Sequence, residues 1–363
     1  MPTTIETQFL TPSPAGAPGA VEQFGGLTQT TVTPAPAQFL MAGAAFDHVY
    51  GPEERAAISA RVPISNLLIT PEDYRDTSET WPDVEIVFAS WGMPVMDKAF
   101  FRRFPKVKVV FYAAGTVRGF VTDLMWRRKI RLTNAAAANA VSVAEFTHAQ
   151  ILLALKQAWQ QSRYIREHGK FPPMRTLPGT YQTTVGLISL GLIGRLVAER
   201  LQQSDLKLIA YDPLFSPEEA AQLGVKLVSL EEIFAKSDVV SCHAPVLKET
   251  EKMIQGRHFE SMKPDATFIN TARGIVVNEK EMIEALQKRP DVHAMLDVTE
   301  PLPPVEGSPL YTLDNVTLTP HIAGSLGLEC RRMGRSMVEE LDRYLAGMPL
   351  RYEIDKQRFQ FMA

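Results

Sequence analysis

The chain has 363 residues, of which 45% are hydrophobic and 22% charged, and its formal net charge is −3. This length suits two domains of ordinary size, and the mild charge gives no sign of binding to nucleic acid or to an anionic membrane. Cys242 and Cys330 form no C-x-x-C pair, so neither a disulfide framework nor a metal site is expected. No apolar run could span a bilayer and no basic targeting segment precedes Arg55, so we expect a cytoplasmic protein.

The N-terminal third has the pattern of an α/β domain. Residues 1–36 are rich in Pro, Thr, Ala and Gly, which predicts a disordered tail. Beyond them, short apolar runs alternate with amphipathic segments, as in a parallel sheet that helices cover on both faces. We expect strands at 38–42, 84–89, 107–112 and 130–133, and helices near 53–60, 95–103 and 119–128.

A long helical pattern over 141–168 leads into a second α/β domain. A last helical pattern covers 326–345, and a short tail follows it. The fold class is therefore α/β, with two Rossmann-like or flavodoxin-like domains and parallel sheets. The strands of the second domain are expected at 184–189, 206–211, 225–228, 238–242, 266–270, 292–297 and 316–318.

The segment TVGLISLGLIGRLVAERL at 184–201 combines a hydrophobic strand, a tight turn and a helix. Gly191 and Gly194 match the second and third glycines of G-x-G-x-x-G, while Ser189 takes the place of the first. The second glycine lets the backbone approach a pyrophosphate, and the third lets the helix pack closely on the strand. The helix start, at Leu192 and Ile193, would offer free N–H groups to the phosphates. This motif predicts a dinucleotide site.

Asp212 ends the next predicted strand, eighteen residues after Gly194. A carboxylate at this point accepts hydrogen bonds from ribose hydroxyls and repels a 2′-phosphate. The residues that follow are Pro213, Leu214 and Phe215, with no Arg or Lys among them. The sequence therefore favours NAD over NADP.

Four segments, at 184–194, 237–250, 262–277 and 315–325, resemble the D-isomer-specific 2-hydroxyacid dehydrogenases, and the similarity covers about 38–350. The resemblance implies an active site in the cleft between two domains, and a homodimer paired through the nucleotide domains. It also implies a substrate domain made of 37–145 and 325–350, an NAD-binding domain at 146–324 and a C-terminal tail at 351–363.

By the same resemblance, Arg273 and His321 are the catalytic residues and Asp297 holds the nicotinamide carboxamide. The backbone at Ala114 and Gly115 would clamp the substrate carboxylate, together with Arg273. Further cofactor contacts are implied at Pro213, His243, Ala244, Thr250, Thr271, Ala272 and Gly324, and no metal is implied.

The chemistry of 2-keto acid reduction agrees with these roles. A hydride reaches the carbonyl carbon, and the oxygen then needs a proton, which a histidine can supply near neutral pH. A guanidinium can grip the carboxylate with two hydrogen bonds and polarise the carbonyl. Arg273 and His321 both follow predicted strands, and ligands of open parallel sheets bind at the carboxyl ends of the strands.

One residue departs from the family pattern. The family places a glutamate beside the histidine, five residues after the aspartate, and here that position holds Leu302. Without this carboxylate, His321 would be protonated only at lower pH, and reduction would be weaker. Three alternatives remain open: an enzyme that works without the pair, a substitute carboxylate from Glu300, or a protein that binds NAD and catalyses little.

The sequence leaves the substrate open, from glyoxylate and hydroxypyruvate to larger 2-keto acids and phosphoglycerate. Arg118 could favour a second anionic group, or could be a solvated arginine. The main alternative function is an NADH-binding sensor on the same fold, as the C-terminal-binding co-repressors illustrate. An enzyme would consume NADH with a 2-keto acid, whereas a sensor would bind NADH without consuming it.

Overall fold

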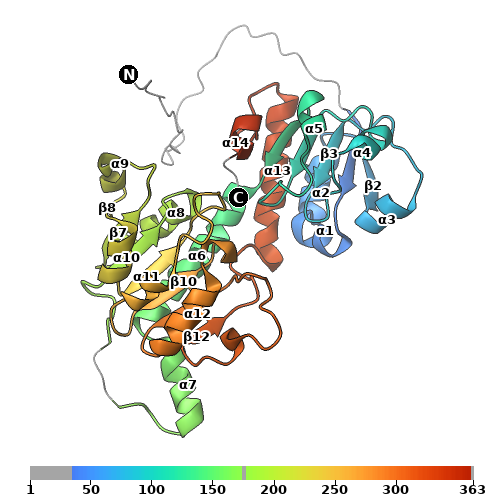
Figure 1. Cartoon of the computed structure of the whole chain (residues 1–363). Coiled ribbons are helices and arrows are strands. Elements are labelled where there is room, and N and C mark those ends of the chain that lie inside the picture. The colour runs from blue at the N-terminus through green and yellow to red at the C-terminus, as the bar shows by residue number, and fades with distance from the viewer. Residues whose placement is uncertain (1–34, 174–176, 361–363) are drawn as a thin grey trace.

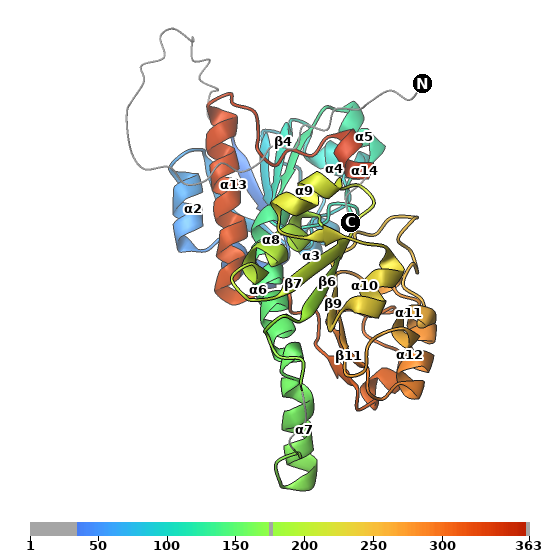
Figure 2. The ribbon, with the colours of Figure 1, turned by 90° about the vertical axis from the view of Figure 1, so that its left-hand side faces the viewer.

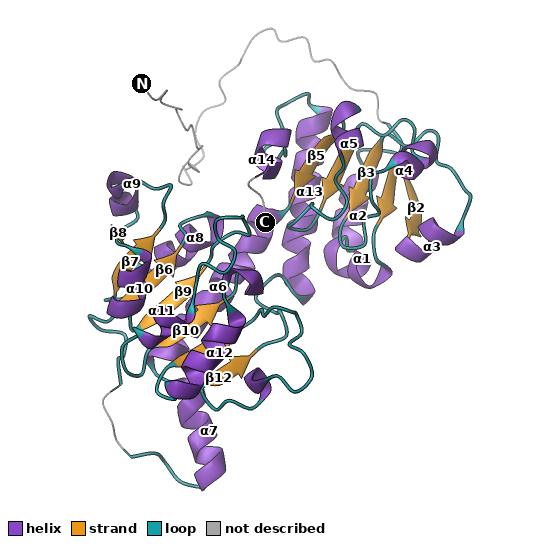
Figure 3. Ribbon diagram, viewed as in Figure 1, coloured by secondary structure: helices purple, strands orange, loops and turns teal. Residues whose placement is uncertain are grey.

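A computed structural model describes residues 35–173 and 177–360, except for the side chains of 65–67. The chain forms two separate parallel sheets, each covered by helices (Figure 1, Figure 3). The predicted fold class is confirmed. Residues 1–34, most of the expected N-terminal tail, lie outside the described residues.

The first sheet has five parallel strands in the order β2-β1-β3-β4-β5, the order of flavodoxin-like folds. Four of its strands were predicted, and β2 was missed, because Ser65 and Asn66 interrupt the apolar run. The strands are β1 (Ala37–Leu40), β2 (Ile64–Ile69), β3 (Ile86–Ala89), β4 (Val109–Tyr112) and β5 (Arg131–Asn134).

Helices bury both faces of this sheet. On one face, Tyr50, Ile58 and Met337 share a core with strand residues such as Phe88 and Phe111. Phe100 and Met125 belong to the core on the other face. The helices are α1 (Gly43–Val49), α2 (Pro52–Ser59), α3 (Pro71–Asp76), α4 (Lys98–Arg103), α5 (Asp123–Arg127) and, from the far end of the chain, α13 (Cys330–Leu345).

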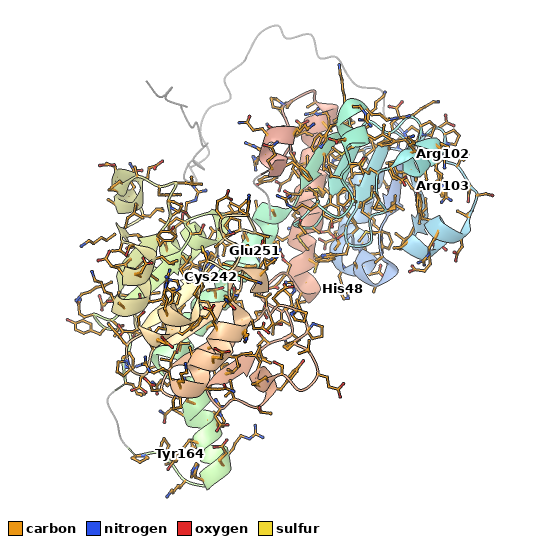
Figure 4. The ribbon with its side chains drawn as sticks, in the orientation of Figure 1. His48, Arg102, Arg103, Tyr164, Cys242 and Glu251 are labelled. Atoms are coloured by element: carbon orange, nitrogen blue, oxygen red, sulfur yellow. The ribbon has the colours of Figure 1, made fainter. Side chains whose placement is uncertain are left out.

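The second sheet has seven parallel strands in the order β12-β11-β10-β9-β6-β7-β8. The strand order runs one way from β6 through β7 to β8 and the other way from β9 to β12, as in a dinucleotide-binding fold. All seven predicted strands are present. Cys242, labelled in Figure 4, ends one of them, and both it and Cys330 are free, buried cysteines. The strands are β6 (Thr184–Ile188), β7 (Lys207–Tyr211), β8 (Lys226–Leu227), β9 (Val239–Cys242), β10 (Thr267–Asn270), β11 (His293–Leu296) and β12 (Val316–Leu318).

Helices α8 (Leu192–Leu201), α9 (Pro217–Gln222), α10 (Leu230–Lys236), α11 (Gly256–Glu260) and α12 (Glu279–Lys288) accompany the second sheet. Short 3₁₀ turns at η1 (Gly274–Val276), η2 (Pro309–Tyr311) and η3 (Gly327–Glu329) shape the loops at and near the ends of the strands.

Two helices connect the sheets. Helix α6 (Ala136–Leu155) leaves β5 and packs on β9, β10 and α8, so the expected boundary at 145/146 falls inside it. Helix α13 lies against both α6 and the first sheet. The single helix predicted over 141–168 is instead two helices, because Gln157 has φ 49° and interrupts it before α7 (Ala158–His168).

Helix α7 projects away from both sheets (Figure 2), and none of its residues is buried. Tyr164 stacks on His168 near its end (Figure 4). Across the described parts of the chain, no helix combines the length and apolar character that a membrane span needs.

Residues 351–360 do not form the separate tail that we expected. Arg131 forms an ion pair with Glu353 at 2.7 Å, and Ile354 is buried in the core of the first domain. Helix α14 (Lys356–Gln360) places Phe359 against the Trp126 ring. This segment packs on the first domain because its apolar residues cover the sheet beside β5.

Candidate functional site

The glycine-rich turn between β6 and α8 is tightly built. Ser189, in the place of the first glycine, has φ 75°, which a side chain seldom adopts. A Cβ on Gly194 would lie 2.1 Å from the Ser189 carbonyl oxygen, so this close contact requires glycine. A Cβ on Gly191 would meet only the Ser189 hydroxyl, at 3.7 Å. Space is therefore open beside Gly191 and closed beside Gly194.

The start of α8 has free hydrogen-bond donors. Arg195 N–H donates to the Gly191 carbonyl, and no side chain caps the helix. Within the described residues, the N–H groups of Gly191, Leu192, Ile193 and Gly194 have no protein acceptor. Free N–H groups at a helix start, beside open space, fit the pyrophosphate of a dinucleotide.

Asp212 follows β7 and closes the same turn. One carboxylate oxygen accepts the Leu190 N–H at 2.7 Å and the Ser189 hydroxyl at 3.4 Å. The other oxygen accepts the Leu214 N–H at 2.9 Å. Asp212 is thus held beside the phosphate turn, where a carboxylate can meet ribose hydroxyls. Pro213, the next residue, is exposed.

His243 lies under the turn, with its ring 3.7 Å from the position of a Cβ on Gly194. Its Nε2 pairs with the Ser241 hydroxyl at 3.0 Å, and burial lowers the pKa of His243 to about 4. The imidazole is therefore neutral at physiological pH. Ala244 is buried beside it, and Thr250 closes the following turn through the Pro245 carbonyl at 2.6 Å.

Arg273 is held in the loop after β10. Asn270 fixes this loop, because its side chain accepts the Ala272 N–H at 3.0 Å and donates to the Arg273 carbonyl at 3.1 Å. The Arg273 guanidinium donates to the Ala272 carbonyl at 2.7 Å, and burial lowers its pKa. It makes no ion pair with any described residue, so a half-buried, charged guanidinium remains free for an anionic ligand.

Asp297, at the end of β11, organises the loop that carries His321. Its carboxylate accepts the Thr319 hydroxyl at 2.7 Å and the N–H groups of Ile322 and Ala323 at 2.8 and 2.9 Å. The His321 N–H donates to the Asp297 carbonyl at 3.1 Å, and His321 has φ 56°. Asp297 therefore holds His321 in an exposed, left-handed conformation.

His321 is exposed, and among the described residues no carboxylate pairs with its imidazole and no group hydrogen-bonds to its ring nitrogens. Leu302, at the position of the family glutamate, is 46% exposed. Glu300 is exposed, and its N–H donates to Glu279 at 2.8 Å. Burial raises the pKa of Glu279. Among the described residues, no hydrogen bond or ion pair joins the Glu300 carboxylate to His321.

The loop after β4 contains Ala114 and Gly115. The Ala114 carbonyl accepts the Ala135 N–H at 3.0 Å, and the Gly115 carbonyl accepts the Asn134 side chain at 2.7 Å. In the described chain, the N–H groups of Gly115 and Thr116 have no acceptor, and the space beside the Gly115 Cα is open. These donors suit a carboxylate.

Three residues that the sequence did not single out support this site, and two of them, Thr147 and Asn139, belong to α6. Thr147 shares a hydrogen bond with Thr271 at 2.9 Å, so α6 supports the loop of Arg273. Asn139 accepts the Ser325 N–H at 2.8 Å and lies against Gly324. The Asn270 amide is the third, and its only sequence signal is its place at a strand end. No metal-binding group of three or more acidic, His or Cys side chains occurs in 35–173 and 177–360.

Together, the sheet order, the free amides and the terminal aspartate define a two-domain, dinucleotide-binding protein. Residues 148–323 match the sequence model of the D-isomer specific 2-hydroxyacid dehydrogenase, NAD binding domain. A glyoxylate reductase of Korarchaeum cryptofilum is 33% identical over 260 residues, covering 69% of this chain and 77% of that protein. The chain belongs to the D-isomer-specific 2-hydroxyacid dehydrogenase family, and it has the NAD-binding domain of that family.

A D-3-phosphoglycerate dehydrogenase of Archaeoglobus fulgidus is 34% identical over 291 residues, which cover 78% of this chain and 52% of that protein. The chain thus spans about half the length of the phosphoglycerate dehydrogenases that it matches. The crystal structure of a glyoxylate reductase from Paecilomyes thermophila superposes with a TM-score of 0.69 at 25% identity, covering 90% of this chain and all of that one.

Proposed function

We propose that the protein reduces a 2-keto acid to the D-2-hydroxy acid with NADH, between its two domains. The observation that carries this proposal is the set of three separate groups of hydrogen-bond donors suited to anions: the α8 amides, the Arg273 guanidinium and the amides of Gly115 and Thr116. The first would bind the cofactor pyrophosphate, and the other two the substrate carboxylate. NADH would supply the hydride to the carbonyl carbon.

In this proposal Arg273 grips the carboxylate and polarises the carbonyl, and His321 gives the proton that the new alkoxide needs. Asp297 would act in two ways: it holds the loop of His321 through three hydrogen bonds, and it would meet the nicotinamide carboxamide. Gly191, Gly194, Asp212 and His243 would hold the rest of the cofactor, with Pro213, Ala244, Thr250, Thr271, Ala272 and Gly324 alongside.

The unpaired His321 has a consequence for rate and pH. A neighbouring carboxylate stabilises the imidazolium, and here no described carboxylate does so. Reduction should therefore be weaker than with the full pair, and it should increase toward acid. This same feature favours the alternative function, an NADH sensor with little catalysis.

NADH oxidation, followed by absorbance against a panel of 2-keto acids from acid to neutral pH, tests the proposal. We expect turnover that rises as the pH falls. We also expect Arg273→Gln and His321→Gln to lower kcat/KM by about a hundredfold or more. NADH binding without turnover of any 2-keto acid would overturn the reductase and support the sensor.

We also propose a homodimer in which α7 packs on a second copy. Its projecting position and the exposed apolar side chains Trp159 and Ile165 support this arrangement. Light scattering with size-exclusion chromatography should give twice the chain mass, and Trp159→Glu with Ile165→Glu should give the monomer. A monomeric wild-type protein would contradict the dimer.

A further inference from the structure

We infer that the substrate is a 2-keto acid with a bulky, uncharged side chain, and that Trp91 forms a wall of its pocket. This inference rests on the proposed function and deepens it. The inferred substrate differs from phosphoglycerate and glyoxylate, after which the relatives are named. The argument comes from the loops at the carboxyl ends of the first sheet.

Trp91 lies in the loop directly after β3, which a backbone hydrogen bond and a close glycine contact hold against the end of β1. The Trp91 carbonyl accepts the Ala42 N–H at 2.7 Å, which ties the loop to the end of β1. Gly92 has φ 89°, and a Cβ there would lie 2.8 Å from the Ala42 nitrogen. Trp91 is nevertheless 44% exposed, and its indole stacks on no described aromatic ring and donates no hydrogen bond to a described residue. The Trp91 indole is therefore available to contact a bound ligand.

The same loop lies beside the proposed carboxylate clamp. The Ser90 hydroxyl donates to the Ala113 carbonyl at 3.0 Å, which joins the β3 exit to the loop of Ala114 and Gly115. Val95, later in the Trp91 loop, is 48% exposed. A substrate held by its carboxylate at Gly115 would thus have apolar surface next to it.

The loop of His321 also approaches this edge of the sheet. Ser325, four residues after His321, bonds to Asn139 at the start of α6, and η3 contacts α1. Both helices begin at carboxyl ends of first-sheet strands, α1 after β1 and α6 after β5. Leu326 is exposed at this junction. The proton donor and the apolar loop therefore lie on the same side of the first domain.

Cations for a second anionic group are lacking at this edge. The loops 41–42, 70, 90–97, 113–122 and 135 contain one basic residue, Arg118. Its guanidinium donates to the Gln360 carbonyl at 3.1 Å and lies over the Phe359 ring, so it is engaged with α14. Binding a phosphate or second carboxylate normally requires free guanidinium or ammonium groups.

Other basic residues of the region are placed elsewhere or paired. Arg102 and Arg103 lie on the outer side of the first domain, away from the second domain (Figure 4). Arg331 pairs with Glu54 at 2.8 Å, and Arg332 lies 3.9 Å from Glu145. Arg273 is committed to the 2-keto carboxylate in the proposed function. The apolar surface formed by Trp91 and Val95 therefore suits a substrate with a hydrophobic side chain.

The experiment compares kcat/KM with NADH for two series at one pH: pyruvate, 2-ketobutyrate, 2-ketoisocaproate and phenylpyruvate, against glyoxylate, oxaloacetate and 3-phosphohydroxypyruvate. We expect kcat/KM to rise along the first series by about fourfold for each added methylene. Oxaloacetate and 3-phosphohydroxypyruvate carry a second anionic group, and we expect their kcat/KM to be at least about a hundredfold below that of phenylpyruvate. A preference for glyoxylate, oxaloacetate or 3-phosphohydroxypyruvate would overturn the inference and leave the reductase standing.

Calorimetric titration of the NAD-saturated protein with phenylpyruvate and 3-phosphohydroxypyruvate keeps the two proposals distinct. If nothing is turned over, the reductase fails, and the order of binding still decides the inference: tighter phenylpyruvate supports it and tighter 3-phosphohydroxypyruvate overturns it. Equal or undetectable binding of both ligands also overturns it.

Trp91→Ala tests the named wall. It should lower kcat/KM for phenylpyruvate by about tenfold and change the value for pyruvate by less than about twofold. Tyr181→Ala is the matched control, because Tyr181 is 73% exposed and precedes β6, so it lies at the amino ends of the second-sheet strands, away from the carboxyl ends. Equal losses for both substrates in Trp91→Ala, or the same selective loss in Tyr181→Ala, would contradict a pocket at Trp91.

Discussion

Leu302 stands where the resemblance to the family implies a glutamate, and it is 46% exposed. We expect Leu302→Glu to place a carboxylate near His321, which stabilises the imidazolium and keeps the proton available at higher pH. The pH of half-maximal keto-acid reduction should rise by about one unit or more, and the rate at neutral pH should increase. Steady-state kinetics from pH 5 to 8 would measure both.

Leu302→Gln is the control, since it has a similar size and polarity to the glutamate variant but no charge. It should leave the pH midpoint unchanged. An equal shift in both variants, or no shift with glutamate, would show that position 302 does not govern His321.

At the residue scale, the sequence could indicate candidate site residues, but it could not predict the hydrogen bonds and contacts that their side chains make. Arg273 and His321 were identified by similarity, and both follow strands of the second sheet. The three hydrogen bonds on the Asp297 carboxylate come mainly from backbone N–H groups, which no side-chain pattern reveals. Arg118 was a candidate anion site on sequence alone, and its contact with α14 depends on long-range packing.

The turn between β6 and α8 contains two glycines with different physical roles. Gly194→Ala should lower the free energy of unfolding by about 2 kcal/mol, because its Cβ would overlap the Ser189 carbonyl. Gly191→Ala should change the free energy of unfolding by less than about 0.5 kcal/mol, since open space surrounds it. It should nevertheless weaken NADH binding by tenfold or more, because the methyl group would fill the space of the pyrophosphate.

Urea unfolding and fluorescence titration with NADH would separate the two effects. Unchanged NADH affinity in Gly191→Ala would contradict the cofactor position. Unchanged stability in Gly194→Ala would contradict the close contact between the helix and the turn.

At the element scale, the apolar pattern predicted all seven strands of the second sheet, because each lies in a short, mainly apolar run between turn residues. It failed at β2, where polar residues lie within an edge strand. It also joined α6 and α7, because the left-handed Gln157 that separates them has neither glycine nor proline beside it.

The whole molecule should lose stability in acid through its buried histidines. Burial lowers the pKa of His243 and of His293 to about 4, below the ordinary value of 6.5. Between these two values the unfolded chain binds more protons than the folded chain, so stability rises with pH and falls as the pH drops. From pH 7 to pH 5, each histidine should cost about 2 kcal/mol of folding stability.

His293→Gln would isolate one of these contributions, because an amide can still bond to the Thr317 hydroxyl that His293 contacts at 3.0 Å. Urea unfolding at pH 7 and pH 5 should show a smaller difference for this variant than for the wild type. An identical pH dependence would mean that His293 is not kept neutral by the fold.

At this scale the sequence indicated two domains, and it did not indicate how α6 and α13 bind them together. Contacts such as Thr147 with Thr271 and Asn139 with Ser325 join residues more than a hundred positions apart, so local patterns cannot predict them. These contacts attach the loops of Arg273 and His321 to α6, the helix that follows the last strand of the first sheet.

The central claim is direct hydride transfer to a 2-keto acid between the domains. The most direct test uses NADH with deuterium at the transferable position, and analyses the product by mass spectrometry and chiral chromatography. We predict one deuterium on C2 of the D-2-hydroxy acid. Product without deuterium, the L-isomer, or bound NADH with no product would contradict the account.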